Sequence, residues 1–136
     1  MTGINVRVRV GTETYALPVE CVLEVGRLGD VDRLPGSGAA VLGLFNLRGR
    51  VLPTFDLATA FGIRREDRAS HLVVTESDGR LAGLAVDDVL DVAPLEGPVQ
   101  QAEADYLVGS TLRDGELIGL IDVGRMFAAL EQLAAP

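Results

Sequence analysis

Three aspartates, Asp87, Asp88 and Asp91, stand close together in the sequence and raise the question of a divalent-metal site. Carboxylate oxygens are the ligands that calcium and magnesium prefer in proteins. Their spacing differs from that of a calcium-binding loop, which needs alternating oxygen ligands and a terminal glutamate. A similar segment earlier in the chain has Cys21 where Asp88 stands, so we interpret the outer two acids as solvent-facing positions of a repeated element. We predict no metal site; a metal-dependent enzyme using these three aspartates is the alternative of a different class.

The other reactive side chains form no recognisable catalytic set. His71 is the only histidine, which excludes a metal site built from several imidazoles. Ser70, Ser77 and Ser110 are candidates for a Ser-His-Asp arrangement, but none of them lies in a nucleophile-elbow motif. The glycine-rich stretch Gly36–Gly38 lacks the lysine of a phosphate-binding loop. The sequence therefore predicts no catalytic residue, no cofactor and no enzyme activity.

The composition limits which binding partners and which cellular compartment we expect for this protein. The chain has 136 residues and a net charge of -8, and an acidic surface repels the phosphates of nucleic acids. Nothing at the start of the sequence resembles a signal peptide, and no window is long and apolar enough for a membrane span. We therefore expect a cytoplasmic protein that binds neither nucleic acid nor the membrane interior.

The chain repeats itself, which is the most useful organising signal in the sequence. Leu17–Val25 aligns without a gap on Leu84–Val92, with leucines, valines and acids in the same order. Leu47–Leu57 aligns on Leu112–Val123 when Asp114 is treated as one inserted residue. We interpret the chain as two diverged halves.

Each half has the same predicted plan of short strands followed by a helix. Apolar residues alternate at period two on either side of turns at Gly11–Glu13 and Ser77–Gly79, which predicts a hairpin at the start of each half. Asp56 and Asp122 then stand where a helix N-cap is expected, and Gly62 ends the first helix early. The second helix is predicted from one apolar face, formed by Val123, Met126, Phe127, Leu130 and Leu133. Two similar sets of short strands suggest a pair of small barrels packed together.

The segment Val41–Leu57 closely resembles the central signature of CheW-like domains, with its Gly-x-x-Asn-Leu-Arg-Gly core and trailing Leu-Pro-x-x-Asp-Leu. The resemblance extends to Tyr15–Val25, Leu81–Val92 and Gly109–Phe127, in the family's order and spacing. It implies an all-β fold of two intertwined SH3-like five-stranded barrels around a shared core, with a C-terminal helix. Residues 1–136 are then a single CheW-like domain of two pseudo-repeated lobes.

The resemblance also implies a function. Proteins of this family are adaptors in chemotaxis signalling that couple methyl-accepting chemoreceptors to a CheA-type histidine kinase. The expected partners are the regulatory domain of that kinase and the cytoplasmic tip of the receptors, so the adaptor is expected at membrane-associated receptor arrays. A related adaptor of another chemosensory-type pathway, such as twitching or gliding motility, has the same sequence features.

Family contact positions carry over to five residues of this chain: Val22, Glu24, Gly43, Arg48 and Val92. The resemblance implies that the first four lie near an apolar groove between the lobes, where the receptor's helical hairpin binds, and that Val92 is another contact position. Each has a structural alternative. Arg48 either offers its guanidinium to a receptor carboxylate or bonds Glu24 within the chain. The two valines either contact a partner or pack in the core, and Gly43 either lies in the site or forms a bulge.

Overall fold

The computed structural model describes residues 3–29, 38–64, 68–102 and 104–134, and the structural statements below concern these residues. Of the glycine-rich stretch Gly36–Gly38, only Gly38 lies within them. The strands are β1 (Ile4–Val10), β2 (Glu13–Pro18), β3 (Val22–Arg27), β4 (Val41–Leu47), β5 (Arg50–Asp56), β6 (His71–Ser77), β7 (Arg80–Val86), β8 (Asp88–Pro94), β9 (Leu107–Arg113) and β10 (Glu116–Ile121). The helices are the 3-10 turn η1 (Val19–Cys21), α1 (Leu57–Phe61) and α2 (Val123–Ala134).

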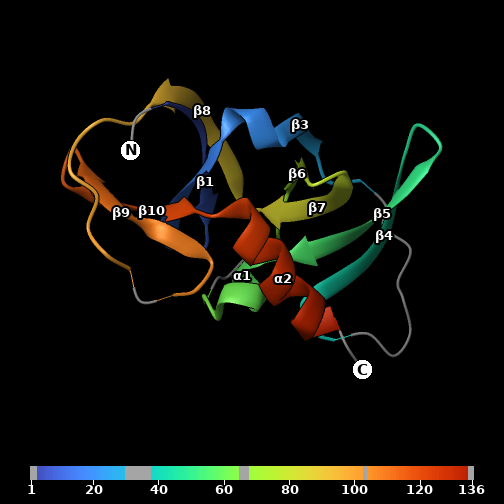
Figure 1. Cartoon of the computed structure of the whole chain (residues 1–136). Coiled ribbons are helices and arrows are strands. Elements are labelled where there is room, and N and C mark those ends of the chain that lie inside the picture. The colour runs from blue at the N-terminus through green and yellow to red at the C-terminus, as the bar shows by residue number, and fades with distance from the viewer. Residues whose placement is uncertain (1–2, 30–37, 65–67, 103, 135–136) are drawn as a thin grey trace.

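The strands form two five-stranded sheets, which we call sheet A and sheet B. Sheet A has the order β8-β1-β2-β10-β9, and sheet B has the order β3-β6-β7-β5-β4. The two orders become identical when β1–β5 of the first half are exchanged with β6–β10 of the second. Each sheet therefore combines strands of both halves, with β9 and β10 at one end of the molecule, β4 and β5 at the other, and the helices between them (Figure 1).

The turns of the two late hairpins correct the sequence alignment. Arg48 and Gly49 connect β4 to β5 with φ of 50° and 85°, and Asp114 and Gly115 connect β9 to β10 with φ of 51° and 79°. Two successive positive φ values are typical of the two-residue turns that match the twist of a hairpin. Asp114 is therefore no insertion, because it occupies the position of Arg48 in a turn of the same length. The similarity of Arg48 to Arg113 misled the sequence comparison.

One apolar core joins both sheets and both α-helices. Fully buried members come from sheet A (Val8, Leu17), from sheet B (Leu84) and from α2 (Met126). Smaller clusters lie within each sheet, around Ile118 in sheet A and around Leu52, Leu72 and Val74 in sheet B. Valine and leucine dominate because β-branched and aliphatic side chains pack well on a pleated surface, and the chain has few aromatic residues.

Both α-helices begin directly after the aspartates predicted as caps, and α1 ends at Gly62 as predicted. Gly62 ends α1 in the left-handed conformation, with φ of 70°. The carboxylate of Asp122 accepts a hydrogen bond from the backbone N–H of Arg125 at 3.0 Å, which caps α2. The carboxylate of Asp56 instead accepts a bond from the Thr59 hydroxyl at 2.9 Å. The predicted fold class, mostly β with two five-stranded units and a C-terminal helix, is confirmed.

Gly119 tests how tightly sheet A is packed, and Gly26 on β3 of sheet B is its control. A Cβ atom at Gly119 would lie 2.7 Å from the Tyr15 ring, whereas one at Gly26 would have no neighbour within 4 Å. We expect Gly119→Ala to lower the free energy of unfolding by about 1–3 kcal/mol through overpacking. Gly26→Ala should change it by less than about 0.5 kcal/mol. Urea unfolding followed by circular dichroism measures both variants, and equal effects would contradict this packing.

Candidate protein-binding site

Arg48 and Glu24 form the most distinctive polar contact among the predicted site residues. The guanidinium donates from Nη1 and Nη2 to the two carboxylate oxygens of Glu24, at 3.2 Å each. Glu24 lies on β3 and Arg48 in the β4–β5 turn, and β3 and β4 are the two edges of sheet B. The ion pair therefore connects the two edges of a strongly curved sheet. The Arg48 side chain is 78% exposed, so its charge remains accessible to a partner.

Gly43 and Val22 lie at irregularities in the same sheet. The register between β4 and β5 shifts between Val41 and Gly43, and Gly43 is buried with φ of 148°. The register between β3 and β6 shifts between Val22 and Glu24. These shifts are β-bulges, which redirect the side chains on either side of them. Val22 is partly buried and packs against the shared core, so the core-packing alternative describes part of its surface.

Val92 lies apart from the other four predicted residues. It belongs to β8 in sheet A, where it pairs with Val6, and its side chain is 58% exposed. The alternative that Val92 packs in the core is therefore wrong. The structure brings Glu24 and Arg48 into contact, keeps Val22 and Gly43 in the same sheet, and places Val92 in the other sheet.

Sequence reasoning missed a set of exposed apolar side chains on the same strands. Leu23 and Val25 on β3 are 51% and 46% exposed, and Val51 on β5 is 61% exposed. The equivalent residues of sheet A are also exposed: Leu90, Val92 and Leu117. Exposed apolar groups that gather on a surface mark protein interaction sites. The same apolar pair repeats in the sequence, because Leu90 and Val92 stand in the second half where Leu23 and Val25 stand in the first.

The three aspartates considered as a metal site bind three different partners. Asp91 accepts two hydrogen bonds from Arg7, at 2.7 Å from Nε and 2.5 Å from Nη2. Asp87 accepts the backbone N–H of Gly11 at 3.1 Å, and Asp88 lies 3.9 Å from Nε2 of His71. Within the described ranges, no cluster of three potential metal ligands is present.

His71 begins β6 and contacts its neighbour in the sequence. Its Nδ1 atom lies 2.9 Å from the Ser70 hydroxyl, which also donates to the carbonyl of Asp87 at 2.8 Å. Ser70, His71 and Asp88 thus resemble the members of a hydrolytic triad in type. The Ser70 hydroxyl already has the Asp87 carbonyl as its acceptor, and none of the three lines a hollow given below. The contacts fix the crossing from β7 to β8.

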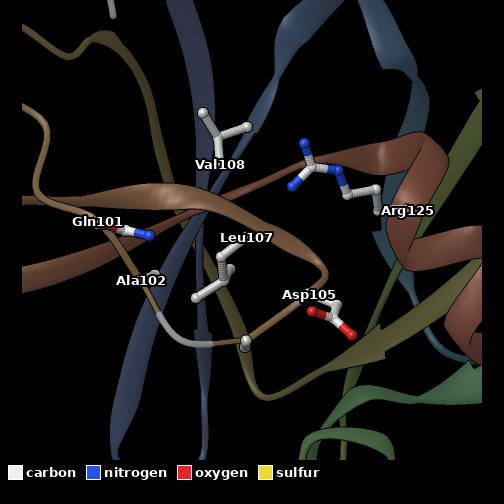
Figure 2. Close-up of a pocket in the computed structure, with 7 residues that line it drawn as sticks. Gln101, Ala102, Asp105, Leu107, Val108 and Arg125 are labelled. Carbon is white, nitrogen blue, oxygen red and sulfur yellow. The ribbon is translucent and has the colours of Figure 1, made fainter.

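Two hollows lie near the start of α2. One, of about 690 Å³, lies between Gln101 on one side and Asp105 and Arg125 on the other, with Leu107 and Val108 between them (Figure 2). The other, of about 390 Å³, is lined by residues of both halves: Pro18, Cys21, Glu76, Ser77, Asp78, Val108, Ile121, Asp122, Val123 and Gly124. Neither contains any of the five predicted site residues.

Cys21 at this second hollow is only partly buried. Burial raises the pKa of its thiol, and the nearby acids Glu20, Asp122 and Glu76 raise it further. A thiol with a raised pKa is a poor nucleophile, because the thiolate is the reactive form.

Comparison with known proteins identifies this arrangement. The model of the CheW-like domain matches residues 5–131. The chain belongs to the CheW-like domain family. A crystal structure of the scaffolding protein TtCheW from Thermoanaerobacter tengcongensis is similar to this CheW-like chain with a TM-score of 0.79 and 28% identity, over 90% of each chain.

Two named relatives place the CheW-like chain in context. It is 30% identical over 137 residues to a probable chemotaxis protein CheW of Rhizobium etli, covering 93% of this chain and 88% of the relative. It is 29% identical to the chemotaxis protein CheA of Borreliella burgdorferi over 128 residues, which are 88% of this chain but 14% of CheA. CheA therefore contains a segment similar to nearly the whole of this CheW-like chain. In the described part of the chain, no helix has the length and hydropathy needed to cross a membrane.

The energy of the Glu24–Arg48 pair can be measured with a double-mutant cycle. Because the pair is exposed, we expect a coupling energy of about 0.2–1 kcal/mol between Glu24→Ala and Arg48→Ala, which decreases as salt is added. Urea unfolding of the four proteins gives this value. A coupling several times larger and independent of salt would show that the pair is mainly structural.

The Arg7–Asp91 pair predicts a pH dependence. Hydrogen bonding from Arg7 holds the pKa of Asp91 below its ordinary value of about 3.9. The pair therefore adds stability above about pH 4, and this contribution is lost as the pH falls through the lowered pKa of the folded state. We expect the stability difference between wild type and Asp91→Asn to stay constant from about pH 7 to about pH 5 and to shrink as the pH falls below about 4. Thermal unfolding across this range measures it, and a difference that does not vary with pH contradicts the assignment.

Proposed function

We propose that the chain is a chemotaxis adaptor that couples methyl-accepting chemoreceptors to a CheA-type histidine kinase. The observation that carries this proposal is the surface of sheet B, where an exposed ion pair lies on the same strands as exposed apolar side chains in a domain of the CheW-like family. An amphipathic helical partner needs apolar contacts for affinity and a few charges to set its register. Arg48, Leu23 and Val25 offer both.

The kinase partner is supported by the relationship between the two proteins. CheA relatives contain a segment similar to this chain. Domains of one fold present equivalent surfaces, and here such surfaces occur at both sheets, as Leu23 and Leu90 illustrate. We place the kinase's regulatory domain on one of these surfaces and a receptor tip beside Glu24 and Arg48.

Two further properties belong to this proposal. We regard residues 1–136 as one domain of two repeated lobes, supported by the matching strand orders of sheets A and B. We place the protein in the cytoplasm beside receptor arrays, as an adaptor without catalytic residues or a cofactor. Neither sheet needs a bound group for its packing, because the core is apolar.

Arg48→Glu tests the receptor contact. The variant reverses one exposed charge and sets a carboxylate opposite Glu24, so it should fold while retaining at most about a tenth of the receptor-tip binding. Arg125→Glu is the matched control, because it makes the same change of charge at the exposed start of α2 and likewise sets a carboxylate opposite the acid that the arginine pairs with, here Asp122. Pull-down of purified receptor tip and kinase regulatory domain at near-physiological salt measures both contacts.

The same experiment can overturn the proposal. Wild-type protein that retains neither partner would exclude the coupling function. Equal loss of binding and thermal stability in Arg48→Glu would show that Arg48 is structural. The kinase and receptors that co-purify from cells assign the adaptor to chemotaxis or to another chemosensory-type pathway.

A further inference from the structure

The ring of Tyr15 fills a specific place in sheet A. It lies edge-on to Phe61, with ring centroids 5.1 Å apart, and passes so close to Gly119 that a Cβ atom there would lie 2.7 Å from it. Phe61 in turn stacks on Tyr106, with centroids 4.0 Å apart and ring planes at 5°. The Tyr15 hydroxyl donates to the carboxylate of Glu13, two residues earlier on the same strand. An aromatic ring with a polar end is thus held between β2, β10 and α1.

The equivalent place in sheet B can be located from strand register. Tyr15 pairs with Gly119 and Ala16 with Leu120 in the parallel contact of β2 with β10. Thr54 pairs with Gly83 in the parallel contact of β5 with β7. The strand orders and the late hairpins correspond without a gap, so Ala82 stands at the position of Tyr15 and Pro53 at that of Gly119. Phe127 stands at the position of Phe61, at the same distance from its helix cap.

Sheet B therefore lacks the ring that sheet A contains, and a cavity is present at this place. It has a volume of about 320 Å³ and is lined by Pro53, Phe55, Arg80, Leu81, Ala82, Phe127, Leu130 and Glu131. Most of these side chains are apolar, and the aromatic wall comes from Phe55 and Phe127. A cavity of this size and lining suits a single aromatic ring, since an apolar cavity of about 150 Å³ already holds benzene.

At the mouth of the cavity, a pair of charged side chains stands where sheet A has Glu13. Arg80 occupies the position of Glu13 at the start of its strand, and its guanidinium forms an ion pair with Glu131 of α2. Both side chains are more than half exposed. The Glu131 carboxylate can accept a phenolic hydroxyl, as Glu13 accepts that of Tyr15. The mouth is thus complementary to a ring whose outer end donates a hydrogen bond.

We propose that this cavity is a socket for a tyrosine side chain of a partner polypeptide, with the ring between Phe127 and Pro53 and the hydroxyl donated to Glu131. Tyr15 in its own pocket is the internal template for this occupant. Pro53 differs from Gly119 by presenting a ring of its own, so the incoming side chain packs on the pyrrolidine face instead of crossing the bare backbone. The socket is separate from Glu24 and Arg48, and the inference does not depend on the proposed coupling function.

The test uses small probes and the full-length chain. Methyl NMR spectra are recorded during titration with p-cresol, toluene and N-acetyl-tyrosinamide. We expect p-cresol and N-acetyl-tyrosinamide to shift the methyl signals of Leu81, Ala82 and Leu130, while those of Ile118 and Leu120 in sheet A stay in place. Toluene lacks the hydroxyl and should bind roughly three- to tenfold more weakly than p-cresol.

Variants connect these shifts to the socket. Ala82→Tyr places a ring in the cavity and should abolish binding of p-cresol. Ala82→Leu fills less of the cavity and should weaken this binding, and it provides the test if Ala82→Tyr does not fold. Glu131→Gln should reduce the preference for p-cresol over toluene, because a neutral acceptor forms a weaker hydrogen bond than a carboxylate.

Three results would overturn the inference. One is the absence of shifts at Leu81, Ala82 and Leu130 with any probe. Another is unchanged p-cresol binding in Ala82→Leu. The third is binding of p-cresol without binding of N-acetyl-tyrosinamide, since the cavity would then admit a free phenol but not a tyrosine attached to a chain.

Discussion

The exchange of strands between the two halves is the constraint on which the rest of this structure depends, because each sheet joins two strands of one half to three strands of the other. β3 of the first half pairs with β6 of the second, and β8 of the second half pairs with β1 of the first. Between β7 and β8, the backbone N–H of Asp87 donates to the carbonyl of Arg9, and the Asp87 carboxylate accepts the N–H of Gly11. Because each sheet is completed by the other half, neither half can satisfy its backbone hydrogen bonds alone. The shared apolar core follows from the same exchange.

The exchange of strands also explains why apolar residues are exposed at the edges of both sheets. β3 and β8 become edge strands, and both carry exposed apolar residues that a fully buried strand would hide. Polar contacts differ between the equivalent edges. In sheet B the pair Glu24–Arg48 connects distant edges and is exposed, whereas in sheet A Asp91 bonds Arg7 on the adjacent strand. Two related surfaces with different charge arrangements suit an adaptor that must distinguish two partners.

Local sequence signals predicted the hairpins, the caps and the two-sheet architecture, because glycine turns, alternating valines and N-cap aspartates act within a few residues. Details that depend on distant residues were not predictable in this way. Asp114 was taken for an insertion because residue similarity outweighed turn geometry, and Val92 was allowed a core position although it lies 58% exposed. The Glu24–Arg48 pair was one of two alternatives, since its geometry depends on the curvature of a whole sheet. The cavity beside Ala82 is visible only when the register of both parallel strand pairs is known.

We propose that the face formed by β3 and the β4–β5 hairpin binds a chemoreceptor. Hydrogen exchange of the full chain, with and without a purified receptor tip, tests this claim most directly. We expect slower exchange in β3 and the β4–β5 hairpin on adding the tip, with little change at the β9–β10 hairpin. Protection that appears only at β9–β10, or nowhere in the chain, would contradict it.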